Sequence, residues 1–286
     1  MPRGLDHIVH AVRDLDAAAD LYRRLGFIVG ARNRHSRSWG TQNRIVQLQG
    51  TYIELLAVAD TTEIVPHSPR HFSFGAFNRD WLKREQGLSM LVLEGCGVSD
   101  TDSFRAAGIG DYELYEFERE GKRPDGAPVT LAFALAFASD PRAPDIGFFT
   151  CFQRHPENFW NSAFQSHANT AVAVAGVVLV AKAPSDHAEF LAAFVGADSR
   201  LTPDGVTITT PRGDIEVVTP AVFASRFGVP APDTSNGARL AAVRFLVKDT
   251  DLLAKAPGIA ALYNRNVTVI GQQGALGAVL VFEPSR

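Results

Sequence analysis

The alternation of apolar and polar residues at the start of the chain predicts a β-α-β-β-β unit. Residues 5–12, Leu-Asp-His-Ile-Val-His-Ala-Val, alternate with a period near two, which is typical of a strand. A helix is expected over 17–25, with Asp14 or Asp16 as its N-cap and Gly26 as the residue that ends it. Three further strands are expected over 27–31, 44–48 and 52–58.

The same pattern recurs three times along the chain, which predicts four copies of one supersecondary unit. The second unit is expected to have strands 87–93, 112–119, 129–138 and 146–153, with a helix that begins at Ser99, Asp100 or Thr101. The third is expected to have strand 172–182, helix 185–194 and a last strand over 214–218; the fourth, strands 240–247, 267–270 and 278–283 with a short helix near 250–256. The connector 60–86 predicts a loop or short helix over 71–77, and 155–170 and 230–237 read as linkers.

His7 and Glu54 are the first candidates for chemistry, because they lie on the first and last strands of the first unit. If those strands are neighbours, both side chains can point to one concave face. An imidazole and a carboxylate on two rigid strands suit a divalent metal ion, or an acid–base pair in a pocket. The alternative is a hydrogen-bonded buried histidine and a glutamate at a sheet edge.

Several motifs in this unit resemble the first module of the vicinal oxygen chelate superfamily, the glyoxalase, bleomycin-resistance and extradiol-dioxygenase fold. The motifs are Asp6-His7-Ile8-Val9, Asp14-Leu15-Asp16, Tyr22, Leu25-Gly26-Phe27 and Tyr52-Ile53-Glu54-Leu55. The segment from His35 through Trp39-Gly40-Thr41-Gln42-Asn43-Arg44 resembles, more narrowly, the glyoxalase-like domain branch.

The resemblance implies an α+β fold in which four β-α-β-β-β modules make two half-open barrel domains. Their expected bounds are 1–154 and 171–286, with the linker 155–170 between them. It also implies that His7 and Glu54 are ligands of a divalent metal ion, of which Zn, Ni, Mn and Fe are the candidates.

Metal sites of this superfamily usually need three protein ligands, and the third is not obvious here. The positions equivalent to His7 and Glu54 are roughly Ser89 and Cys151 in the second module, Gly176 and Glu216 in the third, and Val243 with Phe282 or Glu283 in the fourth. The C-terminal set has carboxylates without a strand histidine, so we expect the site in the N-terminal domain. Cys151 and His155 are the candidates for the third ligand, and His155 is the better donor.

Two further segments are candidates for substrate contacts. His35, Trp39, Asn43 and Arg44 lie in and beside a loop between strands that also carries Arg32, Arg34 and Arg37, so it could bind an anionic group; the alternative is a solvated basic loop. The segment 155–169 is either a lid that adds His155 or Trp160 to the pocket, or a strap whose aromatic residues pack on the sheets. We favour the strap.

Two other histidines are expected to have no chemical role. His10 alternates out of phase with His7, so it should face the opposite side of the sheet and be structural. His187 lies on a predicted helix and is expected at the surface.

Composition narrows the class of partner. The chain has 286 residues, of which 46% are hydrophobic and 21% charged, and its net charge is −3, which disfavours nucleic acid or an anionic membrane as a partner. Two cysteines, Cys96 and Cys151, do not indicate a disulfide framework.

The longest apolar run, 171–181, is too short to span a bilayer, and no signal peptide is visible, so we expect a cytoplasmic protein. A homodimer paired through sheet edges is one expectation; internal pairing of the modules is the other.

Two hypotheses about function remain. The first is a metal-dependent enzyme of lyase, isomerase or dioxygenase type that acts on a small organic substrate, with Glu54 as a metal ligand that could also be the general base. The second is a metal-free protein that binds or sequesters a small organic molecule, as the resemblance to bleomycin-resistance proteins implies.

Overall fold

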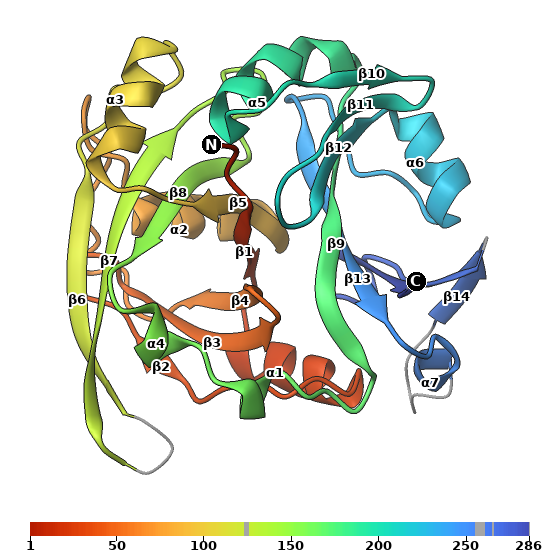
Figure 1. Cartoon of the computed structure of the whole chain (residues 1–286), viewed down its shortest axis with the longest axis horizontal. Helices are drawn as coiled ribbons and strands as arrows, with labels where there is room; N and C mark the ends of the chain where they lie inside the picture. The colour runs from red at the N-terminus through yellow and green to blue at the C-terminus, as the bar shows by residue number, and fades with distance from the viewer. Residues whose placement is uncertain (123–125, 255–260, 265, 286) are drawn as a thin grey trace.

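Two eight-stranded sheets, each curled into a half-barrel, make up the protein (Figure 1). The computed structural model describes residues 1–122, 126–254, 261–264 and 266–285. The first sheet has the order β2-β3-β4-β1-β5-β8-β7-β6 and the second β10-β11-β12-β9-β13-β16-β15-β14. The strands of the first sheet are β1 (Leu5–Ala11), β2 (Asn33–Arg34), β3 (Thr41–Leu48), β4 (Thr51–Val58), β5 (Gly87–Glu94), β6 (Tyr115–Lys122), β7 (Pro128–Ala138) and β8 (Gly147–Gln153). Those of the second are β9 (Ala171–Val180), β10 (Arg200–Thr202), β11 (Gly205–Ile208), β12 (Asp214–Val218), β13 (Arg239–Val247), β14 (Ala261–Asn264), β15 (Val267–Ile270) and β16 (Val279–Pro284).

Each sheet is built from two β-α-β-β-β units joined through their first strands. β1 pairs with β4 in parallel and with β5 in antiparallel fashion, and β9 repeats this arrangement with β12 and β13. The fold is α+β, and the prediction of four modules in two half-open barrels is confirmed.

Helices connect and cover the strands. They are α1 (Leu15–Arg24), α2 (Phe74–Arg84), α3 (Val98–Ala106), α4 (Pro156–Phe159), α5 (Ala188–Val195), α6 (Pro220–Phe227) and α7 (Asp251–Ala254), with 3₁₀ turns η1 (Ser162–Phe164) and η2 (Pro184–His187). Asp14 caps α1, since its carboxylate accepts from the amides of Asp16 and Ala17. No helix among the described residues is long and apolar enough to cross a membrane.

Three local predictions differ from the structure. The strand expected over 27–31 is absent, because Phe27 turns into the core against Phe245 and Phe282, and pairing begins only at β2. The connector forms the full helix α2, where only a loop or short helix was expected. Helix α6 was not predicted, although its capping residue Thr219 accepts from the amide of Val222. Residues 255 and 256 of the helix expected near 250–256 lie outside the described residues.

The three largest apolar cores among the described residues divide the molecule into layers. The largest lies between the two sheets, where Ile8 and Leu91 share a core with Val177 and Phe245. The other two lie on the opposite faces of the sheets, one beside α2 on the first sheet and one beside α6 on the second. The concave face of each sheet is therefore partly covered by the helix that joins its two modules.

Polar groups also bind the two halves together. His10 faces away from His7, as predicted, and its ring nitrogens contact the Tyr22 hydroxyl at 3.0 Å and the Leu276 carbonyl at 3.2 Å. Burial lowers the pKa of His10 to about 4, so its ring is neutral. The prediction that His187 lies at the surface is wrong: it is buried, and its Nδ1 lies 2.7 Å from Asp140 Oδ2.

Gly277 allows a close backbone approach between the two halves of the chain, where it meets Gln86. Its φ is +87°, and a Cβ there would lie 1.7 Å from the carbonyl oxygen of Gln86. We expect Gly277→Ala to lower the free energy of unfolding by about 1–2 kcal/mol for backbone strain and a further 1–3 kcal/mol for the clash. Gly108→Ala is the matched control, because φ is +68° and nothing lies within 4 Å of its Cβ. Urea denaturation that gives equal losses for both variants would contradict this packing.

Candidate functional site

A pocket lies on the concave face of the first sheet, between its two modules. It holds about 460 Å³ of non-protein space, part of it open to solvent. Polar groups from β1, β3 and β4 form one side, and residues of β6, β7 and β8 form the other. Aromatic side chains supply much of the wall: Trp39, Phe74, Phe117, Phe133, Phe149 and Phe159.

The structure brings His7 and Glu54 together in this pocket. β1 and β4 are parallel neighbours, with His7 opposite Tyr52 and Val9 opposite Glu54, so His7 and Glu54 share a face. The distance between His7 Nε2 and Glu54 Oε2 is 3.7 Å, and the two side chains are only 4% and 6% exposed. The His7 ring also stacks on Tyr52, with the centroids 4.3 Å apart.

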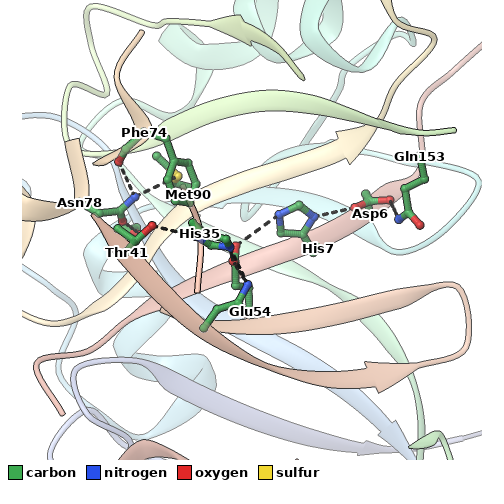
Figure 2. Close-up of polar contacts among 11 residues, drawn as sticks. Asp6, His7, His35, Thr41, Glu54, Phe74, Asn78, Met90 and Gln153 are labelled. Carbon is green, nitrogen blue, oxygen red and sulfur yellow. Dashed lines mark hydrogen bonds and ion pairs between the residues drawn. The ribbon is translucent and has the colours of Figure 1, made fainter. Parts of the chain in front are cut away.

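Asp6 fixes the orientation of the His7 ring. The pairing of β1 with β5 shifts between Leu5 and His7, a bulge that lets Asp6 reach its neighbour's ring on the same face. Asp6 Oδ1 lies 2.6 Å from His7 Nδ1, and Gln153 donates to Asp6 Oδ2 at 3.1 Å. A carboxylate only accepts, so Nδ1 of His7 carries the hydrogen and Nε2 is directed toward Glu54 (Figure 2).

His35 approaches Glu54 from the other side. The Asn43 amide donates to Glu54 Oε1 at 2.5 Å and contacts His35 Nε2 at 3.0 Å. His35 Nε2 therefore accepts, and its Nδ1 donates to the Thr41 hydroxyl at 2.7 Å. Burial lowers the pKa of His35, Glu54 opposes that shift and Arg119 adds to it. The Glu54 carboxylate thus has His7 Nε2 at 3.7 Å from one oxygen and His35 Nε2 at 3.6 Å from the other.

The side chains around Glu54 determine whether the pocket can bind the expected metal ion. Among the residues that the structure describes, no group of three or more His, Cys, Asp or Glu side chains is arranged to hold a metal ion. The Asn43 amide occupies the space between His35 and Glu54. The chemistry of His7 and Glu54 nevertheless fits a divalent cation, because a metal-binding imidazole commonly donates its other nitrogen to a carboxylate, as His7 does to Asp6.

The other predicted site residues divide into two groups. His35, Trp39 and Asn43 line the pocket, as does Cys151, whose thiol pKa is raised by burial. Arg44 does not, because the period of β3 turns it away from Asn43, and its guanidinium donates to Gly30 and Asp16.

His155 and Trp160 also lie outside the pocket. The chain leaves the sheet after Gln153, and the His155 side chain is 46% exposed beside Glu157. The structure therefore does not bring the proposed third ligand to the site. Trp160 lies behind the pocket, edge-on to Tyr52 at 6.0 Å, in a separate cleft. Ser89 bonds to Asn78 instead, and Val92 is the β5 residue opposite His7.

Three residues of the site escaped the sequence analysis. Asp6 and Tyr52 contact the His7 ring, and Arg119 lines the pocket from β6. A signal for Arg119 was present, since it alternates in phase with Phe117 on a strand whose neighbouring residues are mostly polar. Nothing in the sequence showed that β6 would face β4 across the cavity.

In the second sheet, ion pairs occupy the region equivalent to that of His7 and Glu54. Arg244 on β13 pairs with Glu216 on β12 and donates twice to Glu283 on β16, at 2.7 and 2.9 Å. Arg226 on α6 also pairs with Glu216. The carboxylates of Glu216 and Glu283 are thus neutralised by arginines within the fold.

Removing Arg244 tests this account of the second sheet. The side chains of Arg244, Glu216 and Glu283 are 14%, 14% and 16% exposed. We expect Arg244→Met to destabilise the protein by about 2–3 kcal/mol in urea denaturation, below the range for fully buried pairs. Adding Glu283→Gln should restore part of the loss. Arg37→Met, which breaks an exposed pair with Glu63, should cost under about 0.5 kcal/mol. Equal values for the two single variants would contradict the account.

The two half-barrels have the fold that the resemblance to the vicinal oxygen chelate superfamily predicted. The glyoxalase-like domain family matches residues 5–195, so the chain belongs to that family, and the predicted resemblance is confirmed. None of the curated proteins compared with the chain matches it.

Solved structures share the architecture. A hypothetical protein from Staphylococcus aureus has 13% identity and a TM-score of 0.66, with 100% of both chains covered. A mutant of 4-hydroxymandelate synthase from Streptomyces coelicolor has 12% identity and a TM-score of 0.56, covering 100% of this chain and 93% of the other. Methylmalonyl-CoA epimerase from Mycobacterium tuberculosis has 19% identity and a TM-score of 0.37, covering 55% of this chain and 92% of the other. At these identities the first two likenesses show the fold alone.

Proposed function

We propose that this chain is an enzyme that binds a small organic substrate in the pocket and moves a proton at one of its carbon atoms, with Glu54 as the base. The observation that carries the proposal is the buried Glu54 carboxylate, which lines the cavity and accepts a hydrogen bond from the Asn43 amide, with His7 and His35 within 3.7 Å of its oxygens. A general base must be held within reach of its proton, and rigid strands provide that. Proton transfer at carbon is chemistry of isomerases and lyases, which we favour over a dioxygenase.

The surrounding residues have supporting roles. Glu54 takes the proton from the substrate carbon, and the Arg119 guanidinium on the wall of the same cavity stabilises the negative charge left on the substrate. Asp6 holds the His7 ring in place, and the aromatic wall excludes water from the reacting carbon. Glu54 returns the proton to the same or a neighbouring carbon, so atoms and charge balance over the cycle.

His7 and Glu54 are the residues that would hold a divalent cation. When bound, such an ion would polarise a substrate oxygen as a Lewis acid and stabilise the negative charge of the intermediate. Zn, Ni, Mn and Fe remain the candidates.

A metal-free binding protein is the second candidate. The observation that favours it is the Asn43 amide, which contacts both His35 and Glu54 and leaves the carboxylate hydrogen-bonded without a cation. Binding of a small molecule between the aromatic walls would then be the whole function.

Exchange of carbon-bound hydrogen in D₂O distinguishes the two candidates without knowledge of the product. Protein is incubated with a panel of small organic acids, ketones and aldehydes, and proton NMR follows the loss of C–H signals. We expect at least one compound to exchange at least 100-fold faster than without protein, and Glu54→Gln to remove nearly all of that rate. Compounds that bind but exchange at the uncatalysed rate would leave the binding protein as the function.

Metal analysis of the same preparations is the companion measurement. Protein purified without chelator and loaded with each metal should hold about one ion per chain, and His7→Ala and Glu54→Gln should lose it. His155→Ala, at an exposed site outside the pocket, should keep it. No ion under any loading condition would exclude the metal from the proposal while leaving the exchange test intact.

A further inference from the structure

Arg119 stands apart from the other partly buried arginines. It lines the pocket from β6 beside Tyr52 and Glu54. In residues 1–122, 126–254, 261–264 and 266–285 its guanidinium has no hydrogen bond or ion pair. By contrast, the side chains of Arg3, Arg239 and Arg244 are 12%, 13% and 14% exposed, and each pairs with a carboxylate.

An unpaired guanidinium in a half-enclosed cavity is costly unless a ligand uses it. Burial lowers the pKa of Arg119, while the nearby Tyr52 and Glu54 oppose that shift. Guanidinium keeps its charge at neutral pH and offers five N–H donors in a planar fork. Those donors match a carboxylate in two parallel hydrogen bonds.

We propose that Arg119 binds the carboxylate of a monoanionic organic acid whose apolar or aromatic body fills the pocket. The class of acid follows from the charges on the walls. Glu54 faces the same cavity, so it repels a second negative charge, which disfavours phosphate monoesters and dicarboxylates. The aromatic wall suits a planar or branched apolar body.

The chemical consequence of carboxylate binding by Arg119 rests on the proposed function. With the carboxylate on Arg119, part of the acid's apolar body lies toward Glu54, and a C–H group there could lose its proton to that base. The binding claim itself does not depend on Glu54 being a base.

Matched acid and amide ligands test the binding claim. The probes are benzoate and benzamide, phenylacetate and phenylacetamide, 3-phenylpropionate and its amide, with phenyl phosphate as the dianion, all measured by isothermal titration calorimetry. For at least one pair we expect the acid to bind about 10- to 100-fold more tightly than its amide, as a charge-assisted bidentate contact would produce. Phenyl phosphate should bind more weakly than that acid.

Variants of Arg119 test whether this residue causes the preference for the acid over its amide. Arg119→Gln should remove the preference for the acid and leave amide binding within about two-fold, and Arg119→Lys should retain part of it. Arg154→Gln, just after β8, is the matched control and should behave as wild type, because the Arg154 side chain is 47% exposed and pairs with Glu116. Overturning results are no acid bound more tightly than its amide, including no binding at all, an unchanged preference in Arg119→Gln, or phenyl phosphate as the tightest ligand.

The Glu54→Gln variant separates this inference from the proposed function. It should bind the acid at least as tightly as wild type, because a like charge is removed. Acid binding that depends on Arg119 without hydrogen exchange would sustain this inference and refute the enzyme. Hydrogen exchange that occurs only on neutral compounds and is unchanged in Arg119→Gln would sustain the enzyme and refute this inference.

Discussion

The site depends on the parallel pairing of β1 with β4. That register puts His7 and Glu54 on the same face of adjacent strands, so the backbone pairing itself brings the two side chains near each other. The bulge after Leu5 then adds Asp6 on the same face, so one short strand supplies both the imidazole and the group that orients it. A shift of one residue in this pairing would turn the whole set toward the core between the sheets.

The two half-barrels have the same strand topology, but their concave faces differ. In the first, the concave face keeps a cavity with polar groups at its base and aromatic walls. In the second, Arg244 joins the carboxylates at the equivalent positions, and Phe223 and Phe227 of α6 pack into the core on that face. One sheet therefore carries the candidate site while the concave face of the other is packed, and the shared core and the His10 contact hold the two together.

The sequence predicted what depends on local pattern. The period-two strands, the four repeated units, and the placement of His7 with Glu54 follow from alternation and from motifs that resemble a known family. It could not predict features set by long-range contacts. His155 was an attractive ligand by residue type, yet the chain leaves the sheet just before it. Arg119 was overlooked because its role arises only when β6 curls across the cavity, and His187 because its partner Asp140 lies in the other half.

The most direct test of this account is the hydrogen position on the His7 ring, measured by long-range ¹H–¹⁵N NMR on histidine-labelled protein, with His7→Gln used to assign the signal. The account predicts that Nδ1 carries the hydrogen, donated to Asp6, and that Asp6→Asn disturbs this tautomer. A His7 ring whose hydrogen sits on Nε2 alone, with Nδ1 bare, would contradict the proposed orientation of the imidazole toward Glu54 and the site built on it.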